Sequence, residues 1–333
     1  MNVGFFIRHF TERGTEVSVY DYATYNEDIL HNKSLIICFT PETQQQYHFP
    51  STRVSYPKFS KRFTILEIKE IEDMKLIIQT YNLAFFYTQT HGGPDIYRFN
   101  YSHIWGTCKT IKHCVFDTRY PEGDYCISIS HTLNHKLGTT LPVIPYIVEL
   151  PTHEEHLRNE LNIPHDAVVF GRYGGMTEFN IPWVHEAIQK CVLTHENYYF
   201  LFMNTKEFYT HPRIIHLDVN VDVHYKTKFI NTCNAMIHAR EMGETFGLSV
   251  AEFSFQNKPV LTCTSGDVEH VHILGEKALL YHSKEELLHL FHHIKPILQE
   301  RNDWNAYRSY SPQHVMEQFN RLFNADKEYS PIL

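Results

Sequence analysis

The chain has 333 residues, of which 43% are hydrophobic and 20% are charged. This length suits two domains, and the composition is that of a folded protein rather than a disordered one. The formal net charge of −8 argues against a general nucleic-acid binder, which needs a basic face, and provides no attraction to anionic membranes.

The cysteines and the apolar segments bear on the cellular compartment. Seven cysteines are scattered, mostly inside apolar strand-like runs, as is typical of buried free thiols in a reducing compartment. Residues 1–8 have no charged region followed by a long apolar run, so we expect no secretory signal. No stretch reaches the ~18 apolar residues of a membrane-spanning helix. We therefore predict a cytoplasmic protein without an integral membrane segment.

The first half of the chain alternates strands and helices. A strand at Val3–Ile7 leads through a loop into a helical pattern after Glu16, as at the first turn of a nucleotide-binding fold. The loop lacks the G-x-G-x-x-G motif of dinucleotide sites. A mostly parallel sheet covered on both faces is predicted, with a helix at Ile71–Tyr81 and further strands at Ser34–Phe39, Phe63–Ile68, Leu83–Thr88, Thr110–Phe116, Tyr125–Ser130 and Pro142–Val148.

Residues 149–162 are polar and include Pro151, which predicts a linker between two domains. A short helix is expected within it at His156–Leu161. The second half restarts at Ala167 with a strand that runs into a glycine-rich loop at residues 171–175. Alternation then resumes, which predicts a second doubly wound domain, with elements at Ile181–Leu193, Tyr198–Met203, Arg213–Leu217, Val221–Thr232, Lys258–Thr262, Val268–Leu274, Ala278–Tyr281 and Lys284–Ile294.

The most informative stretch is Gly243–Glu252, with the sequence GETFGLSVAE, which lies between two strand-like segments. It is expected to form the loop and crossover helix of a βαβ unit, with the helix beginning near Phe246 and Thr245 as its N-cap. Free N–H groups and the helix dipole at such a start favour an anion. Gly243 and Gly247 would let the backbone come close to that ligand.

Two carboxylates flank this predicted anion site. Glu244 precedes the helix and Glu252 lies within it. Carboxylates accept hydrogen bonds from sugar hydroxyls, so an anion at the helix start with hydroxyls on both sides describes a nucleotide sugar. Either glutamate alone would more often be a charge that stabilises the helix or a solvated side chain.

The pattern E-T-F-G-L-S-V-A-E resembles the donor-site signature of retaining glycosyltransferases of the GT-B fold, in the family 4-like group that includes sucrose synthase-like and mannosyltransferase-like enzymes. The local match covers Asn234–Thr264. The resemblance implies that Glu244 contacts hydroxyls of the donor sugar and that Glu252 holds the ribose. It also implies an α/β protein of two doubly wound Rossmann-like domains facing each other across a cleft.

The resemblance assigns these domains and their loops. We expect an acceptor-side domain at residues 1–150 and a donor domain at 151–303, with a helix at about 304–325 packing back onto the first domain. An Arg directly after Gly171 would bind the donor diphosphate, and Arg172 matches it. The Lys expected some six residues later is absent, and Glu178 stands near its place. The diphosphate charge must then be met by Arg172 and the helix start, with Arg240 as a further candidate.

Three residues of the first half complete the candidates. In GT-B enzymes the first loop lies near the acceptor and the donor phosphates, which points to Gly14 and Thr15. A turn glycine before a helix is an equal alternative. A histidine near a strand end of the first domain contacts the donor sugar in the family, and His113 could match it. A packed strand histidine is again an equal alternative.

The predicted activity is transfer of a hexose-type sugar from a UDP- or GDP-sugar to a hydroxyl of a glycan or glycoconjugate, with retention of anomeric configuration. A catalytically inactive nucleotide-sugar or glycan-binding relative is the alternative, because the expected Lys is missing. We expect no cofactor and no metal: the 24 histidines include close pairs but no known zinc spacing. The P-loop motif of phosphotransferases is absent.

Overall fold

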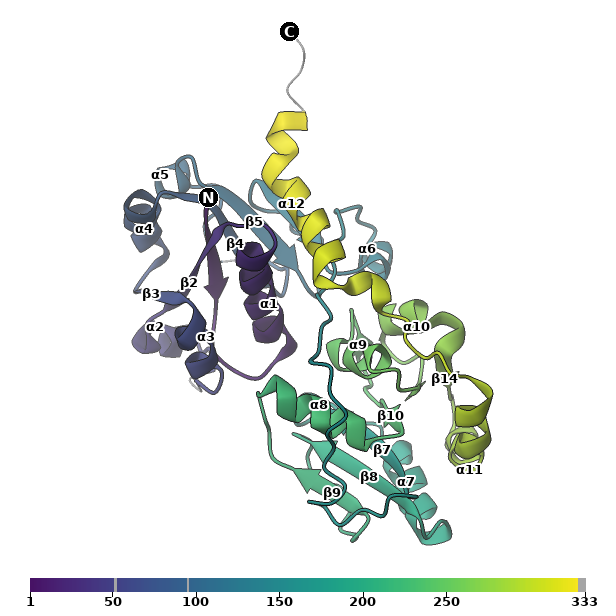
Figure 1. Cartoon of the computed structure of the whole chain (residues 1–333). Helices are drawn as coiled ribbons and strands as arrows, with labels where there is room; N and C mark the ends of the chain where they lie inside the picture. The colour runs from purple at the N-terminus through teal and green to yellow at the C-terminus, as the bar shows by residue number, and fades with distance from the viewer. Residues whose placement is uncertain (51–52, 95, 329–333) are drawn as a thin grey trace. The chain divides into compact units, whose positions relative to one another are not determined.

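The computed structural model describes residues 1–50, 53–94 and 96–328. The chain divides into an N-terminal unit, residues 1–147 with the segment that begins at Tyr310, and a C-terminal unit, Val148–Ser309. Each unit is built on a six-stranded parallel sheet with helices on both faces (Figure 1). The prediction of two doubly wound α/β domains is confirmed.

The sheet of the N-terminal unit has the strand order β3-β2-β1-β4-β5-β6. Its strands are β1 Asn2–Ile7, β2 Lys33–Phe39, β3 Thr64–Ile68, β4 Leu83–Thr90, β5 Lys109–Cys114 and β6 Tyr125–Ser128. Its helices are α1 Gly14–Asp28, α2 Pro41–Gln46, α3 Tyr56–Arg62, α4 Met74–Tyr81, α5 Ser102–Trp105, α6 His131–Leu137 and α12 Pro312–Glu328.

Alternation along the strands divides the apolar side chains of this unit between two layers. Phe5 belongs to the layer beneath α1 and α12, whereas its neighbour Phe6 belongs to the layer on the opposite face. Phe319 of α12 packs on Tyr22 of α1, with ring centroids 5.0 Å apart. The last helix therefore completes one face of the first sheet.

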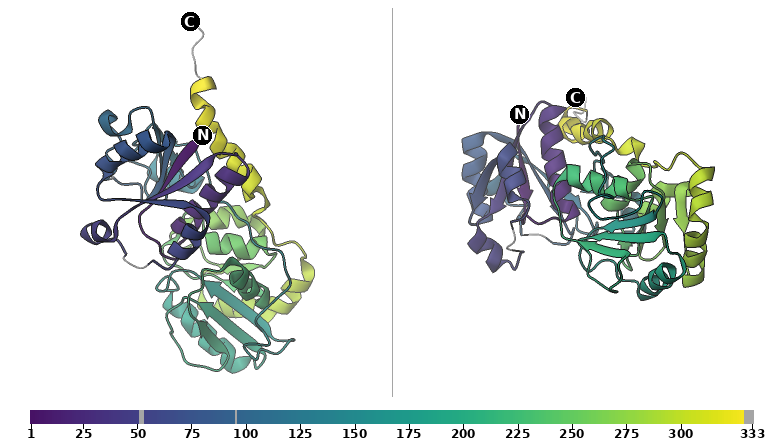
Figure 2. Two further views of the ribbon diagram at one scale, coloured as in Figure 1. Left: turned by 60° about the vertical axis from the view of Figure 1, so that its left-hand side comes forward. Right: turned by 60° about the horizontal axis from the view of Figure 1, so that its bottom comes forward.

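The sheet of the C-terminal unit has the order β14-β12-β10-β7-β8-β9, and Figure 2 shows its strands from two further directions. Its strands are β7 Val168–Tyr173, β8 Tyr198–Met203, β9 Ile214–Leu217, β10 Ala235–Ile237, β12 Val260–Thr262 and β14 Ala278–Leu280. A separate short pair joins β11 Gly243–Glu244 to β13 Asp267–Val268. The helices are α7 Pro182–Thr194, α8 Val223–Thr232, α9 Leu248–Phe255, α10 Glu269–Leu274 and α11 Lys284–Glu300.

Helices cover both faces of this second sheet. Phe170 of β7 packs on Phe291 of α11, with ring centroids 4.8 Å apart. Tyr173, three residues further along β7, instead packs on Phe229 of α8 and Phe253 of α9. Side chains at the end of β7 therefore alternate between the α7–α11 face and the α8–α9 face.

Two predicted elements are wrong. Pro142–Val148 forms no strand and makes one isolated bridge, between Ser128 and Val143. The physical reason is that Pro142 and Pro145 have no N–H to donate to a neighbouring strand. The segment His156–Leu161 is a series of turns rather than a helix.

Candidate functional site

The loop between β11 and α9 differs in detail from the prediction. The helix begins at Leu248, two residues later than expected, and the N-cap position belongs to Gly247 rather than Thr245. Gly247 has φ +83°, and a Cβ there would lie 3.1 Å from Cβ of Glu244. A left-handed glycine therefore turns the chain into the helix. The side chains of Thr245 and Phe246 are buried, so this loop offers a ligand its backbone.

Gly243 is required by a close approach of two backbones. Its φ is +66°, and a Cβ would lie 2.1 Å from the carbonyl oxygen of Asp267 and 2.3 Å from that of Ser265. Only glycine fits where β11 pairs with β13. Gly243 thus fixes the position of Glu244, which is the next residue.

Glu244 lies in a network of charges. Its Oε2 accepts a hydrogen bond from Arg240 Nη1 at 2.8 Å, and its Oε1 lies 3.3 Å from His238 Nε2. Burial alone would raise the pKa of Glu244, but the hydrogen bond from His238 and the charge of Arg240 outweigh it and lower the pKa to about 2. The other side of the Arg240 guanidinium donates to Glu178 Oε1 at 3.0 Å. The glutamate that replaces the expected Lys is therefore a partner of Arg240.

Glu252 lies one turn along α9 from Leu248 and is only 4% exposed. Its carboxylate accepts hydrogen bonds from the Tyr173 hydroxyl and from the ammonium of Lys226 on α8. Burial raises the pKa of Tyr173 well above its usual range, so the phenol keeps the proton that it donates. Lys226 was not predicted, because it is 26 residues from Glu252 in sequence and no motif marks it.

Arg172 and Tyr173 are consecutive and point to opposite faces of the sheet. The Arg172 guanidinium donates to Thr205 Oγ1 at 2.6 Å and to the carbonyl oxygens of Gly175 at 3.0 Å and Asn204 at 3.4 Å. It is 5% exposed, and burial lowers its pKa to about 10. In this conformation Arg172 ties together the loops after β7 and β8.

Gly171 is explained by packing. A Cβ on it would lie 2.2 Å from Sγ of Cys233 and 3.1 Å from the Phe253 ring. The residue therefore lets α9 and the end of α8 approach β7, and it needs no ligand to account for it.

The predicted residues of the N-terminal unit are His113, Gly14 and Thr15. His113 lies in β5 with no exposed surface, and its Nδ1 is 2.8 Å from the Tyr87 hydroxyl. Burial lowers its pKa to about 3. The neutral ring is enclosed in the core, so a contact with a donor sugar is not available in this conformation.

Gly14 is the first residue of α1, and Thr15 donates a hydrogen bond to Glu16 Oε2 at 3.0 Å. The same loop brings His9 Nδ1 to 2.6 Å from Glu16 Oε1. This His9–Glu16 pair at the carboxyl end of β1 was not predicted, since the two residues are seven apart and match no motif.

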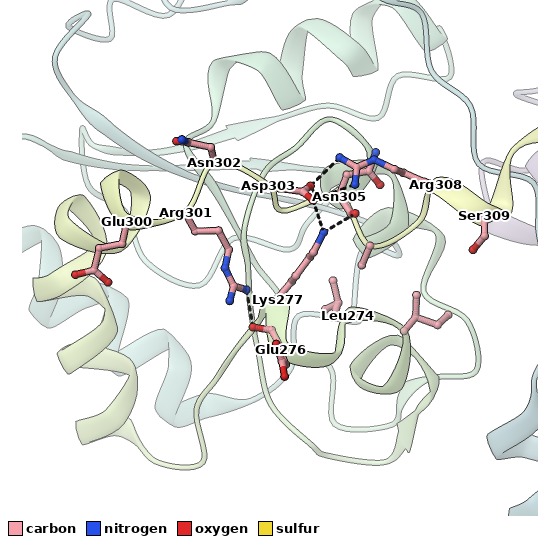
Figure 3. Close-up of a pocket in the computed structure, with 12 residues that line it drawn as sticks. Leu274, Glu276, Lys277, Glu300, Arg301, Asn302, Asp303, Asn305, Arg308 and Ser309 are labelled. Atoms are coloured by element: carbon pink, nitrogen blue, oxygen red, sulfur yellow. Dashed lines mark hydrogen bonds and ion pairs between the residues drawn. The ribbon is translucent and has the colours of Figure 1, made fainter.

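A hollow of about 850 Å³ lies elsewhere on the C-terminal unit, between η2 (Gly275–Lys277) and the segment after α11 (Figure 3). Three of its charged side chains are paired with one another: Asp303 binds Lys277 and Arg308, each at 2.9 Å or less. Arg301 donates to the carbonyl oxygen of Glu276. None of the predicted donor-site residues lines it.

Over the residues that the structure describes, no helix is long and apolar enough to cross a membrane. Within the same residues, no group of three or more His, Cys, Asp or Glu side chains is placed to hold a metal ion. The seven cysteines all lie among the described residues, and no disulfide bond joins any of them. The cytoplasmic location and the absence of a metal or cofactor stay predictions.

Comparison with solved structures places the fold among GT-B glycosyltransferases. A glycosyltransferase from Rickettsia africae ESF-5 superposes with a TM-score of 0.74 at 14% identity, covering 99% of each chain. Anabaena Alr3699/HepE, in complex with UDP and glucose, gives 0.69 at 13% identity, covering 98% of this chain and 100% of that one. A putative UDP-N-acetylglucosamine 2-epimerase from Listeria monocytogenes gives 0.58 at 11% identity, covering 99% and 96%.

No protein-family model matches the sequence, and no curated protein matches it. At these identities the structural comparisons show the fold, and the predicted GT-B fold is confirmed. The same fold hosts more than one chemistry among these structures. The function must therefore be argued from the site.

Proposed function

We propose that the protein is a glycosyltransferase that moves a hexose-type sugar from a UDP- or GDP-sugar to a hydroxyl of a glycan or glycoconjugate. The observation that carries this proposal is the placement of Glu244 and Glu252 on either side of the α9 start. Glu244 ends β11, and Glu252 lies four residues after Leu248, ~6 Å along the helix axis. The helix start would bind the diphosphate, with Glu244 on the sugar and Glu252 on the ribose.

The positive charges near this site support the same assignment. Arg240 lies beside Glu244, and Lys226 lies beside Glu252. Together with the α9 amides, they would balance the diphosphate in place of the missing Lys. Arg172 donates its hydrogen bonds to protein atoms, but its positive charge would still attract the diphosphate.

Both carboxylates of the site are held in ion pairs, Glu252 with Lys226 and Glu244 with Arg240, so neither is free to act as a nucleophile. As the bond to the diphosphate breaks, negative charge grows on the leaving oxygen, and preorganised donors stabilise it. We therefore propose that the acceptor hydroxyl attacks the sugar from the same face that the diphosphate leaves, which retains the anomeric configuration. The hydroxyl proton passes to the leaving diphosphate oxygen.

The test is donor binding, hydrolysis and transfer by the purified protein over a panel of UDP- and GDP-sugars. Turnover of at least one donor, with the product anomer assigned by NMR, is expected. Binding without turnover of any donor would favour the inactive nucleotide-sugar-binding alternative. An inverted product would refute the same-face mechanism.

Glu252→Gln checks the ribose assignment. The variant keeps the side-chain shape and removes the charge that Lys226 faces, so KM for the donor should rise about tenfold, as for one lost interaction of about 1.4 kcal/mol. The value of kcat should change less, because ribose contacts bind ground and transition states alike. Glu241→Gln is the control, since Glu241 is exposed and outside the site. A larger effect on kcat than on KM would show that Glu252 has another role.

A further inference from the structure

Behind Glu244 lies a row of three buried polar side chains. His238 follows β10, Thr262 ends β12, and His270 lies in α10. Thr262 Oγ1 is 2.8 Å from His238 Nδ1 and 3.0 Å from His270 Nε2. Their exposures are 4% for His238 and 0% for Thr262 and His270. The row therefore runs from the interior of the C-terminal unit to the carboxylate of Glu244.

The direction of these hydrogen bonds follows from the groups at the two ends of the row, Glu244 and His270. The ionised Glu244 accepts only, so His238 Nε2 must carry a proton. Nδ1 of the same ring lies 2.8 Å from the Thr262 hydroxyl, a group that donates as well as accepts. With one ring proton, on Nε2, His238 would present Nδ1 to Thr262 as an acceptor.

The hydroxyl of Thr262 then donates to His238. Its other acceptor, the carbonyl oxygen of Cys263, is farther away at 3.4 Å. The oxygen of Thr262 in turn accepts from His270 Nε2. Burial lowers the pKa of His270 to about 3, so the ring carries one proton, and Nε2 lies 3.0 Å from the Thr262 oxygen. The single ring proton of His270 is thus best placed on Nε2.

We propose that His270, Thr262 and His238 form a directed hydrogen-bond relay that positions Glu244 for the donor sugar. This inference rests on the proposed function. All three are positioning residues, because only Glu244, whose side chain is 15% exposed, can reach a ligand. His238 holds one carboxylate oxygen and Arg240 the other, which leaves lone pairs on both oxygens for sugar hydroxyls.

Orientation is what the relay would supply. The terminal torsion of a glutamate has a broad, roughly two-fold preference, so the carboxylate turns unless both oxygens are held. A misplacement of about 1 Å at a reacting centre can lower turnover by about 10²-fold. Arg240 fixes one oxygen, and the relay fixes the other against the rigid ends of β10 and β12.

Thr262→Val tests the proposal, because valine keeps the branched shape and removes the hydroxyl. With UDP-glucose as donor, kcat should fall ~10- to 100-fold, whereas the Kd for UDP, which has no sugar, should stay within about twofold. Thr227→Val is the matched control: Thr227 is equally buried, and its hydroxyl donates to the carbonyl oxygen of Val223 in its own helix. The relay would be overturned by an unchanged kcat with UDP-glucose. It would also be overturned by a Kd for UDP that rises by as large a factor as kcat falls.

A second measurement needs neither ligand nor activity. In protein labelled with ¹⁵N-histidine, two-bond ¹H–¹⁵N spectra should show His238 and His270 as neutral Nε2–H tautomers, and Thr262→Val should shift both rings. An Nδ1–H tautomer or an imidazolium at either position would overturn the relay. A wild-type protein that shows these tautomers but binds neither UDP nor any nucleotide sugar would refute the proposed function alone.

Discussion

The low pKa of Glu244 makes the stability of the protein depend on pH in a defined way. Its ordinary value of 4.5 is lowered to about 2 in the folded protein, which at 1.36 kcal/mol per pH unit corresponds to about 3 kcal/mol of stability at pH 7. Since the folded state binds this proton more weakly than the unfolded chain, the contribution is complete above about pH 5 and is lost as pH falls through 4.5 toward 2. Glu244→Gln removes the titration and, with it, this contribution.

Urea unfolding of wild type and Glu244→Gln at a series of pH values measures this difference. The gap in the free energy of unfolding should be about 3 kcal/mol at pH 7 and should shrink by about 1.4 kcal/mol for each pH unit below 4.5. Comparison within the pair cancels the other carboxylates that titrate there. Glu241→Gln, at an exposed position, should track wild type throughout. A gap that stays constant from pH 6 to pH 3 would refute the assigned pKa and the charge network that lowers it.

Two further variant pairs probe the same unit. Lys226→Ala should weaken UDP binding about tenfold in calorimetry, as for the loss of one charged contact, whereas Lys228→Ala, on the same helix but paired with Glu155, should stay within about twofold. Equal losses of UDP affinity in the two variants would show that Lys226 acts only through the overall charge of the helix. Gly243→Ala should lower the free energy of unfolding by about 3 kcal/mol or more, because its Cβ meets backbone at 2.1 Å. Gly14→Ala, with nothing within 4 Å of its Cβ, should change it by less than about 1 kcal/mol; equal losses would refute the steric argument.

The parallel sheets were predictable because periodicity and apolar runs are local properties of the sequence. Strands such as β2 and β8 have long buried runs, and β8 has the predicted bounds of Tyr198–Met203. The α9 start was misplaced by two residues because a left-handed Gly247 replaced the expected Thr cap. That choice depends on the tight space at Gly247, where a Cβ would lie within 3.2 Å of Glu244 and His270, and no local pattern encodes this.

The partners of the site residues were beyond the sequence for the same reason. Lys226 meets Glu252, and Thr262 meets His238, only because parallel strands and crossover helices bring distant segments to one sheet edge. For His113, the sequence predicted the place in the strand but not the environment of the side chain. The residue lies near the end of β5, as expected. The face of β5 on which it lies and its enclosure by α1 depend on packing.

The chain leaves the N-terminal unit after Ile147 and rejoins it at Tyr310. Val315, Met316 and Phe319 then fill the layer beside α1. On the ribosome, the continuous C-terminal unit can close its own sheet while the earlier one still has an uncovered apolar face. At about 5–20 residues per second, the wait from residue 147 to α12 is roughly 10 to 30 s. A nascent chain stalled before Tyr310 would thus expose the apolar face of the first sheet, and we expect a chaperone to bind this face until α12 is made.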